Sequence, residues 1–338
     1  MIKFFENYDL SALNTFGVPA KAKYFVEVKE EVEIAELFRD PIFKNNQKLF
    51  LGGGSNILFT RDFDGLVILN SLKGIEIINE TDEEVVVRVM GGEIWHDLVK
   101  FSVDREYWGL ENLSLVPGTV GAAPMQNIGA YGVEIKETLE SVEAFEIETG
   151  AKRIFNKEEC ELGYRTSVFK TSLKGKYFIS AVNFVLSKKG KMNTSYRVLQ
   201  EYLELNKIEA RSPKDISDAV VAIRKSKLPD PRVTGNAGSF FKNVFVDREK
   251  LEELKKQYPE IPSFEEDDMV KVPSGWLIEQ CGWKGKKIGS TGVHDKQALV
   301  LVNHGGASGQ EIMDLSQKII ISVKEKFGLN LEREVNIM

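Results

Sequence analysis

The sequence contains few of the residues that build disulfide frameworks or metal centres. Its 338 residues include two cysteines, Cys160 and Cys281, and three histidines, too few for a disulfide-bonded domain or a zinc cluster. No apolar run approaches the roughly 20 residues that span a membrane, and residues 1–7 lack the apolar stretch of a signal peptide. These absences predict a cytosolic protein without a structural metal or a membrane anchor.

An excess of charge of one sign is also missing. The chain has 45 Lys and Arg against 51 Asp and Glu, a net charge of −6, and 28% of its residues are charged. This balance is typical of an ordinary solvent-exposed surface and argues against nucleic acid or a membrane as a partner. At about 100–200 residues per domain, the length predicts two or three domains, each with its own core.

Strand-like and helix-like segments alternate along the chain without a repeat. Their periodicity predicts strands at residues 23–28, 48–51, 66–69, 74–78, 84–89, 141–147, 152–155, 177–186 and 298–303. It also predicts helices at residues 32–38 and 94–103, and others that begin at 213 and 308. The pattern indicates an α+β protein whose N-terminal two-thirds is rich in strands.

Capping residues and prolines mark where two of these helices begin and where one ends. Ser212 is suited to be the N-cap of the helix that begins at residue 213, and Ser308 and Glu311 have the spacing of a capping box. Residues 228–231, Leu-Pro-Asp-Pro, cannot remain helical, because proline lacks an amide donor and biases its predecessor to extended geometry. We therefore predict a domain boundary there, and expect the strand-like tail, residues 331–337, to rejoin an earlier sheet.

The first candidate for a binding site is the run Gly52, Gly53, Gly54, Ser55 and Asn56, directly after the strand expected at 48–51. Consecutive glycines let backbone N–H groups point together at an anion, with two polar side chains as further donors. The same run also suits a tight turn with no ligand. Its spacing matches neither the dinucleotide fingerprint of Rossmann folds nor the P-loop.

The second candidate is residues 116–132, which carry four glycines and two prolines and almost no charge. A loop exposed to solvent would be more polar, so this segment is expected to lie against something flat or apolar. Its small residues permit close approach to a ligand such as a diphosphate or an aromatic ring system. The alternative is a buried structural loop whose backbone groups find partners within the protein.

Two further segments carry the reactive side chains. Arg165 lies in Gly-Tyr-Arg-Thr at 163–166, and a lone arginine on a loop is most often simply exposed. Arg224 and Lys227 end the helix that begins at 213, where cations also stabilise the helix dipole. Ser239 follows a glycine in residues 235–243, and the two phenylalanines after it could wall it off from water.

Together these segments closely resemble the UDP-N-acetylenolpyruvoylglucosamine reductases, flavoenzymes of peptidoglycan precursor synthesis. The resemblance extends from Asn14 to Val335, and Tyr196 with the segment around it resembles the type I branch. It rests on several motifs in order: Gly-Gly-Gly-Ser-Asn at 52–56, Pro-Gly-Thr-Val-Gly at 117–121, Gln-Asn-Ile-Gly-Ala-Tyr-Gly at 126–132, Gly-Tyr-Arg at 163–165, Lys-Leu-Pro-Asp-Pro at 227–231 and Gly-Asn-Ala-Gly-Ser-Phe-Phe-Lys-Asn at 235–243.

The resemblance implies a two-lobed FAD-binding module of the vanillyl-alcohol-oxidase (PCMH) type and an α+β substrate-binding domain. It places the first lobe at residues 1–72 and the second at 73–227, with the tail 330–338 returning to the second lobe, and the substrate domain at 228–329. It implies a monomer that uses NADPH and non-covalent FAD to reduce the enolpyruvyl ether of a UDP-sugar to UDP-N-acetylmuramate.

Three catalytic residues carry over by motif. After hydride transfer to C3 of the vinyl ether, Arg165 would stabilise the enolate that develops at C2 and the carboxylate. Ser239 matches the proton donor to C2, a role that requires a dry pocket and a nearby cation, Lys227 or Lys242. Glu334 matches the second catalytic group, which is protonated or shares a proton when it assists.

Binding residues carry over at matching spacing. For the substrate, Lys227 and Tyr196 suit the diphosphate, although Tyr196 could instead be a core aromatic of a helix. The other two substrate-binding residues implied are Asn243 and Gln297. The residues implied for FAD are Gly52, Gly53, Gly54, Ser55, Asn56, Pro117, Gly118, Gly121, Asn127, Gly129, Tyr131 and Arg224.

Two other functions fit a related fold. A flavoprotein carbohydrate oxidase would need a base beside the flavin, whereas Arg165, Ser239 and Glu334 suit protonation. A nucleotide-sugar-binding protein without flavin would not need to keep these three residues. We therefore expect the reductase.

Overall fold

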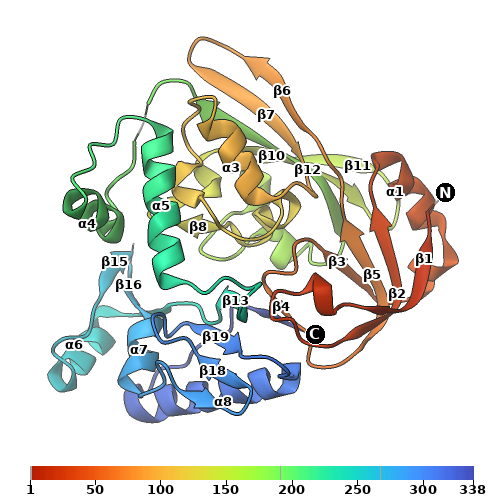
Figure 1. Ribbon diagram of the computed structural model, residues 1–338. Helices are drawn as coiled ribbons and strands as arrows, with labels where there is room; N and C mark the ends of the chain where they lie inside the picture. Colours follow the sequence, from red (N-terminus) through yellow and green to blue (C-terminus); the bar gives the residue numbers. More distant parts are fainter. Residues whose placement is uncertain (1, 191, 267) are drawn as a thin grey trace. The chain divides into compact units, whose positions relative to one another are not determined.

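The computed structural model describes residues 2–190, 192–266 and 268–338. It divides into two compact units, each assembled from separate stretches of the sequence. Unit 1 comprises residues 2–8, 22–54 and 63–226, and unit 2 comprises residues 9–21, 55–62 and 227–338. Figure 1 labels their helices and strands. Among the described residues, no helix has the length and apolar character needed to cross a membrane.

Unit 1 contains two main sheets with helices beside them. Its strands are β1 (Phe4–Asp9), β2 (Lys21–Val28), β3 (Lys48–Leu51), β5 (Phe63–Asn70), β6 (Ile75–Glu80), β7 (Glu84–Met90), β8 (Gly129–Ala130), β9 (Val133–Glu134), β10 (Leu139–Glu146), β11 (Lys152–Asn156) and β12 (Tyr177–Ser187). Its helices are α1 (Glu31–Arg39), α2 (Pro41–Asn45), α3 (Trp95–Val103), α4 (Arg197–Leu205) and α5 (Pro213–Lys227).

The first sheet has the order β1-β2-β5-β3, and β5 is parallel to both β2 and β3. Parallel strands of one sheet need a crossover connection, which α1 and α2 supply between β2 and β3, on either side of β5. These helices bury Ile34, Leu37 and Phe43 in the same apolar cluster as Val26 and Ile68 of the sheet. The glycine run at residues 52–54 begins directly after β3.

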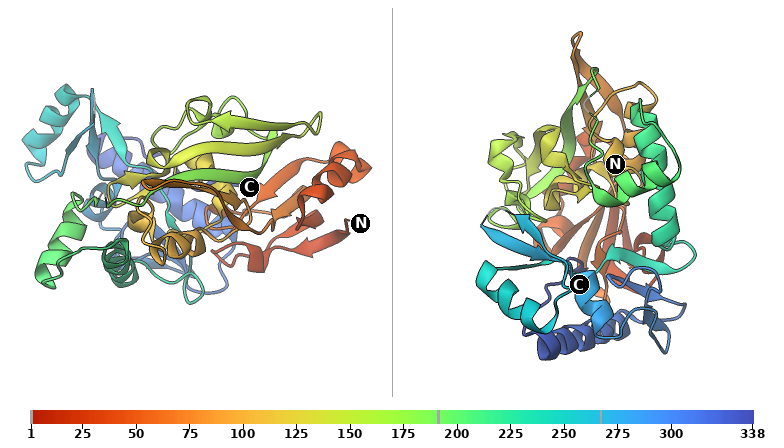
Figure 2. Two further views of the ribbon diagram at one scale, coloured as in Figure 1. Left: turned by 90° about the horizontal axis from the view of Figure 1, so that it is seen from above. Right: turned by 90° about the vertical axis from the view of Figure 1, so that its left-hand side faces the viewer.

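The second sheet is antiparallel and has the order β11-β10-β12-β7-β6, seen from above in Figure 2. In β7, Val85, Val87 and Val89 alternate toward the core, as a strand with one buried face requires. Trp95 of α3 is fully buried in the same cluster, and its indole N–H donates to the Leu113 carbonyl at 2.9 Å. This core supports the loop that follows residue 115.

A buried ion-pair network crosses the second sheet. Glu143 of β10 accepts two hydrogen bonds from the Arg88 guanidinium, at 2.7 and 2.8 Å, and lies 2.9 Å from the Lys152 Nζ. Burial by itself would raise the pKa of Glu143, but the hydrogen bonds from Arg88 and Lys152 outweigh it and lower this pKa to about 2. The side chain of Glu143 is only 8% exposed, so solvent screens this network weakly.

We expect Glu143→Gln to lower the free energy of unfolding near neutral pH by about 2 kcal/mol, because the change leaves the partly buried Arg88 with only Glu31, at 3.6 Å, as a counter-charge. A carboxylate whose pKa is depressed on folding stabilises the protein above its unfolded pKa and loses this effect as pH falls toward 2. The deficit should therefore shrink in urea titrations at progressively lower pH. Glu201→Gln is the control, since its partner Arg197 is 85% exposed. An equal, pH-independent loss in both variants would contradict the prediction.

Unit 2 is smaller and has a long helix along its main sheet. Its strands are β4 (Ile57–Leu58), β13 (Gly235–Ser239), β14 (Val244–Val246), β15 (Phe264–Glu266), β16 (Met269–Val272), β17 (Lys287–Ile288), β18 (Thr291–Val293), β19 (Val300–Asn303) and β20 (Asn336–Ile337). Its helices are α6 (Arg248–Gln257), α7 (Ser274–Gln280) and α8 (Gly309–Phe327), and α8 packs on β18 and β19 of the sheet β13-β19-β18-β17 (Figure 1).

The predicted helix signals are confirmed. Ser212 and Asp215 exchange hydrogen bonds at the start of α5, and Ser308 and Glu311 form the capping box that begins α8. Gly328 ends α8 in the left-handed conformation with φ +68°, where glycine carries no steric penalty. These starts and stops are local features, which is why the sequence alone predicts them.

The C-terminal tail pairs with other strands than we expected. Strand β20 lies parallel to β4, with Asn336 opposite Ile57. Residues 332–334 pair with residues 240–242, through the Glu334 N–H to the Phe240 carbonyl and the Lys242 N–H to the Glu332 carbonyl, each at 2.9 Å. We predicted a return to residues 73–227, whereas the pairing found in unit 2 is with residues 57–58 and 240–242. Periodicity identifies a strand but does not select its partner.

Candidate active site

Two glycine-rich loops of unit 1 meet at the end of β3. A Cβ on Gly52 would lie 2.4 Å from the Thr119 Oγ1, and a Cβ on Gly53 would lie 3.0 Å from the Cα of Gly118. Gly121 is equally confined, because a Cβ there would lie 3.0 Å from the Cα of Gly91. The glycines are thus required for close approach between the two predicted FAD-binding loops, and not only for turning the chain. The structure brings Gly52, Gly53, Gly118 and Gly121 together.

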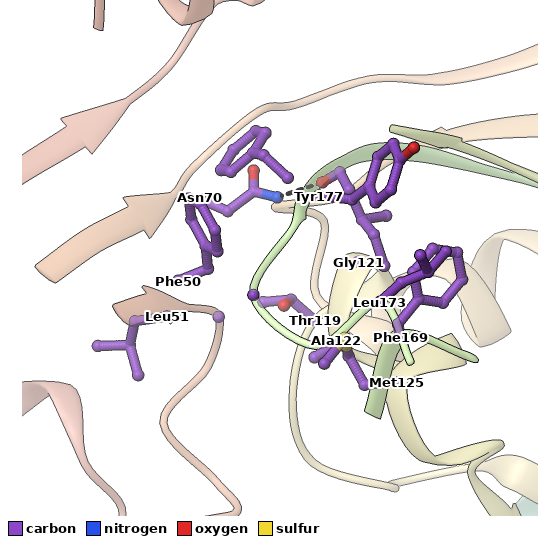
Figure 3. Close-up of a pocket in the computed structure, with 14 residues that line it drawn as sticks. Phe50, Leu51, Asn70, Thr119, Gly121, Ala122, Met125, Phe169, Leu173 and Tyr177 are labelled. Atoms are coloured by element: carbon purple, nitrogen blue, oxygen red, sulfur yellow. Dashed lines mark hydrogen bonds between the residues drawn. The ribbon is translucent and has the colours of Figure 1, made fainter. Parts of the chain in front are cut away.

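A pocket of about 110 Å³ opens beside these loops (Figure 3). In Figure 3 the side chains of Phe50 and Asn70 lie at one side, and those of Phe169, Leu173 and Tyr177 at the other, with Gly121 between them. Asn70 is held by a hydrogen bond from its Nδ2 to the Ile179 carbonyl at 2.9 Å. The remaining lining residues are Leu51, Gly52, Thr119, Ala122, Met125, Gly175, Phe178 and Ile179.

The residues around this pocket fit the cofactor that the motifs predict. The Thr119 Oγ1 is buried and has no hydrogen-bond partner among the described residues, so it is a hydroxyl available to a ligand. Aromatic and aliphatic walls with few polar groups suit a flat ring. At about 110 Å³ the pocket would hold only part of an FAD molecule. Thr119 and Asn70 were absent from our predicted set, although Thr119 lies within the Pro-Gly-Thr-Val-Gly motif that could have identified it.

We expect Gly52→Ala to weaken FAD binding by tenfold or more, because the new methyl group must displace the Thr119 hydroxyl and separate the two loops. Titration of the apoprotein with FAD, followed by quenching of flavin fluorescence, measures the loss. The double variant Gly52→Ala/Thr119→Ala is the matched control, since it removes the hydroxyl that clashes. Thr119→Ala alone shows what the loss of this hydroxyl itself costs. If the double variant binds FAD no better than Gly52→Ala while Thr119→Ala binds it normally, the contact with Thr119 is not the cause.

Arg165 is held against the second glycine-rich loop. Its Nη2 donates to the Gly129 carbonyl at 3.0 Å, and its backbone has φ +53°, in the left-handed region. The buried Asn127 donates from its Nδ2 to the Gly163 carbonyl at 3.1 Å and to Glu134 at 2.8 Å. Two hydrogen bonds therefore link residues 127–129 to residues 163–165, and Arg165 is only partly exposed.

Tyr131, Tyr196 and Arg224 form a second group in unit 1. The rings of Tyr131 and Tyr196 meet edge to face, with centroids 5.4 Å apart and planes at 74°. The side chains of Arg224 and Tyr131 interact, while the buried Nε of Arg224 has no hydrogen-bond partner among the described residues. Burial lowers the pKa of Arg224 and raises that of Tyr131. Tyr196 is 44% exposed at the N-cap of α4, so it is not a core aromatic.

In unit 2, backbone pairing brings Ser239 and Glu334 into neighbouring positions. Glu334 bonds to the backbone of Phe240, the residue after Ser239, and the Asn56 Nδ2 donates to the Glu334 carbonyl at 3.3 Å. Ser239 follows Gly238, whose φ is +66°, and is exposed. Phe240 and Phe241 are 0% and 1% exposed and pack on each other, so they belong to the core and do not enclose the serine as we expected.

The two predicted substrate amides converge on the start of α7. The Asn243 Oδ1 accepts from the Ser274 N–H at 3.2 Å, and a Cβ on Gly275 would lie 3.3 Å from the Gln297 Oε1. Of the two lysines considered as neighbours of Ser239, Lys242 forms an ion pair with Glu332 at 2.5 Å, whereas Lys227 is exposed at the end of α5.

Two family models match two separate stretches of the chain. The model "UDP-N-acetylenolpyruvoylglucosamine reductase, C-terminal domain" matches residues 230–338, and an FAD-binding domain model matches residues 22–152. The crystal structure of UDP-N-acetylenolpyruvylglucosamine reductase from Thermus caldophilus superposes with a TM-score of 0.67 and 22% identity, over 100% of this chain and 98% of that one. This likeness confirms the predicted fold class.

Relatives with much higher identity span nearly the whole chain. The UDP-N-acetylenolpyruvoylglucosamine reductase of Flavobacterium johnsoniae is 48% identical over 98% of both chains. Those of Amoebophilus asiaticus and Chromobacterium violaceum are 49% and 44% identical, over 98% and 100% of this chain and 98% and 99% of theirs. With the fold and the gathered motif residues, these similarities establish that the chain belongs to the UDP-N-acetylenolpyruvoylglucosamine reductase family.

Proposed function

We propose that this protein uses NADPH to reduce the enolpyruvyl ether of UDP-N-acetylglucosamine enolpyruvate, giving UDP-N-acetylmuramate for peptidoglycan synthesis. The family membership supports this activity, and so does the FAD-binding domain at residues 22–152. The observation that carries the proposal is the pairing of residues 332–334 with 240–242, because it brings the motif residues Ser239 and Glu334 together from distant parts of the sequence.

When bound, FAD would supply the two-electron redox chemistry that links oxidation of NADPH to reduction of the vinyl ether. The glycine loops at Gly52 and Gly118 and the Thr119 hydroxyl would hold it. The other residues proposed to bind FAD are Gly53, Gly54, Ser55, Asn56, Pro117, Gly121, Asn127, Gly129, Tyr131 and Arg224. Arg165 would face the substrate carboxylate, where its fixed guanidinium stabilises negative charge as it develops at C2. Its hydrogen bond to the Gly129 carbonyl keeps the side chain in place before the substrate arrives.

Ser239 would donate the proton to C2, and Glu334 would assist from the paired strand. The serine is exposed in unit 2, so the dry surroundings that this chemistry requires would have to come from the bound substrate. Glycine at position 238 leaves the hydroxyl accessible from that side. A hydroxyl is a weak acid, and for this reason the serine needs a positive neighbour, for which Lys227 and Lys242 remain the candidates.

Four side chains are proposed to bind the UDP-sugar. Lys227 supplies a point charge and Tyr196 a hydroxyl donor for the diphosphate. Asn243 and Gln297 would bind polar groups of the nucleotide-sugar, as their common position at the start of α7 supports. We further propose that residues 1–72 and 73–227 form the two FAD-binding lobes and that residues 228–329 form the substrate-binding domain. We also propose that the protein is cytosolic and monomeric.

An anaerobic titration tests the function directly. NADPH should bleach the flavin absorption band of the purified protein, and the enolpyruvyl sugar nucleotide should then restore it stoichiometrically. Bleaching without recovery would leave a flavin reductase with another substrate. Bleaching by simple sugars, followed by recovery of the band with consumption of oxygen, would instead support the carbohydrate oxidase, and absence of a flavin band would refute both.

A further inference from the structure

We propose that Asn112 is a positioning residue that fixes the substrate-binding Tyr196 by tying two loops of unit 1 together. This inference rests on the proposed function, in which Tyr196 binds the substrate. Asn112 lies in a 3-10 turn (Glu111–Leu113) and is only 1% exposed. Its Nδ2 donates to the Tyr131 carbonyl and to the Asn193 carbonyl, both at 2.9 Å. One side chain thus joins the loop of Tyr131 to the segment that leads into Tyr196.

The chemistry of the partners determines which end of the Asn112 amide forms these hydrogen bonds. Both partners are carbonyl oxygens, so only the amide NH₂ group can bind them. The Asn112 Oδ1 is buried and has no hydrogen-bond partner among the described residues. An unsatisfied buried acceptor destabilises the folded chain. The amide therefore serves the two carbonyls it binds, since a side chain needed only to fill space could be apolar.

Further contacts hold the same two segments together. The Asn193 Nδ2 donates to the Gly132 carbonyl at 3.3 Å, and the Asn193 Oδ1 accepts from the Ser195 hydroxyl at 2.7 Å. At the end of this segment the ring of Tyr196 packs edge to face on the ring of Tyr131. Hydrogen bonds at Asn193 and an aromatic contact at Tyr196 thus attach one short stretch to the Tyr131 loop.

Tyr196 has few other restraints. Its side chain is 44% exposed, and α4 begins there without a side-chain cap. A tyrosine that is already oriented loses less conformational entropy when it binds a diphosphate, so orientation before binding improves affinity. Releasing the segment should therefore weaken substrate binding much more than it slows the chemistry of the bound substrate. It should leave the reaction of NADPH with the flavin unchanged.

The test compares Asn112→Leu and Asn112→Asp with Asn206→Ala. Both changes at 112 preserve size and remove the two donors. Asn206 is the control because its Nδ2 also donates to a carbonyl, that of Tyr202 at 2.8 Å, but at the exposed end of α4. Losing two hydrogen bonds should raise KM for the enolpyruvyl sugar nucleotide about tenfold. The value of kcat, the rate of flavin reduction by NADPH and both constants of the Asn206 variant should stay close to those of the wild type.

A double-mutant cycle with Tyr196→Ala separates positioning from general damage. If Asn112 acts through Tyr196, Asn112→Leu should add little to the KM of the Tyr196→Ala protein. Independent, additive effects would overturn the proposal, as would an unchanged KM or an equal loss of flavin reduction. If the variants at 112 fail to fold, Asn193→Ala removes the hydrogen bond from the Asn193 side chain to the Gly132 carbonyl, at a partly exposed position. This variant should raise KM in the same selective way, and an unchanged KM would overturn the proposal. Failure of the wild type to oxidise its flavin with this substrate would instead refute the proposed function.

Discussion

Ser239→Ala is expected to abolish turnover while the flavin is still reduced by NADPH. The variant lacks the hydroxyl that would protonate C2, and general acid catalysis by one group typically contributes about 10²–10⁴ in rate. Flavin reduction requires no proton from this residue, so its rate should match that of the wild type. Stopped-flow absorbance separates the two steps: the band should bleach with NADPH and recover very slowly with the enolpyruvyl sugar nucleotide.

Ser239→Cys is the matched control for this experiment. A thiol is close in size to the hydroxyl and is also a proton donor, so part of the second half-reaction should return. Because Phe240 and Phe241 are buried next to the serine in sequence, each variant should also be checked for thermal stability. Equal loss of both half-reactions in a stable Ser239→Ala protein would contradict a role as proton donor.

Arg165→Ala should lower kcat by about 10²–10³, the usual cost of removing one preorganised electrostatic group from a transition state. Arg165→Lys keeps the charge but loses the planar fork and the bond to the Gly129 carbonyl, so it should recover only part of the rate. Alanine, lysine and arginine all meet the same constraint at φ +53°, which makes them comparable. Single-turnover oxidation of the reduced enzyme measures the effect.

Arg153→Ala provides the control for loss of an arginine in the same unit. Its guanidinium is 47% exposed and pairs with Glu159 at the surface. We expect this variant to keep its activity and nearly all of its stability. If Arg165→Ala raised KM but left kcat unchanged, Arg165 would contribute to binding without stabilising the transition state.

The starts of helices were the structural features that the sequence predicted most reliably. The start of α5 at Ser212 and of α8 at Ser308 follow from side chains within three residues of each helix, and both are found. The partner of the tail could not be predicted, because the pairing of β20 with β4 joins segments nearly 280 residues apart. The hydrogen bond from Asn56 to Glu334 likewise joins residues that are 278 positions apart in the sequence. Strand periodicity contains no information about such partners.

The same distinction applies to the candidate site. Motifs identified Arg165, Asn127 and Gly129 one by one, and the structure adds the hydrogen bonds from Arg165 to Gly129 and from Asn127 to Gly163. Asn112 was missed because one asparagine in a short turn, between Glu111 and Leu113, has no chemical signature of its own. The available signal was an asparagine close before a loop already predicted to bind a ligand. Its partners are backbone carbonyls, which are present at every residue and therefore cannot be recognised from sequence.

The pairing of β20 with β4 has a consequence for how the chain folds during synthesis. Unit 1 is complete once residue 226 has left the ribosome, whereas unit 2 incorporates residues 9–21 and 55–62 and must wait for residues 336–337. Strand β4 therefore emerges early and stays without its partner while most of the polypeptide is translated. Unpaired strand edges are prone to aggregation. We therefore expect the incomplete chain to be most prone to aggregation in the interval before translation ends.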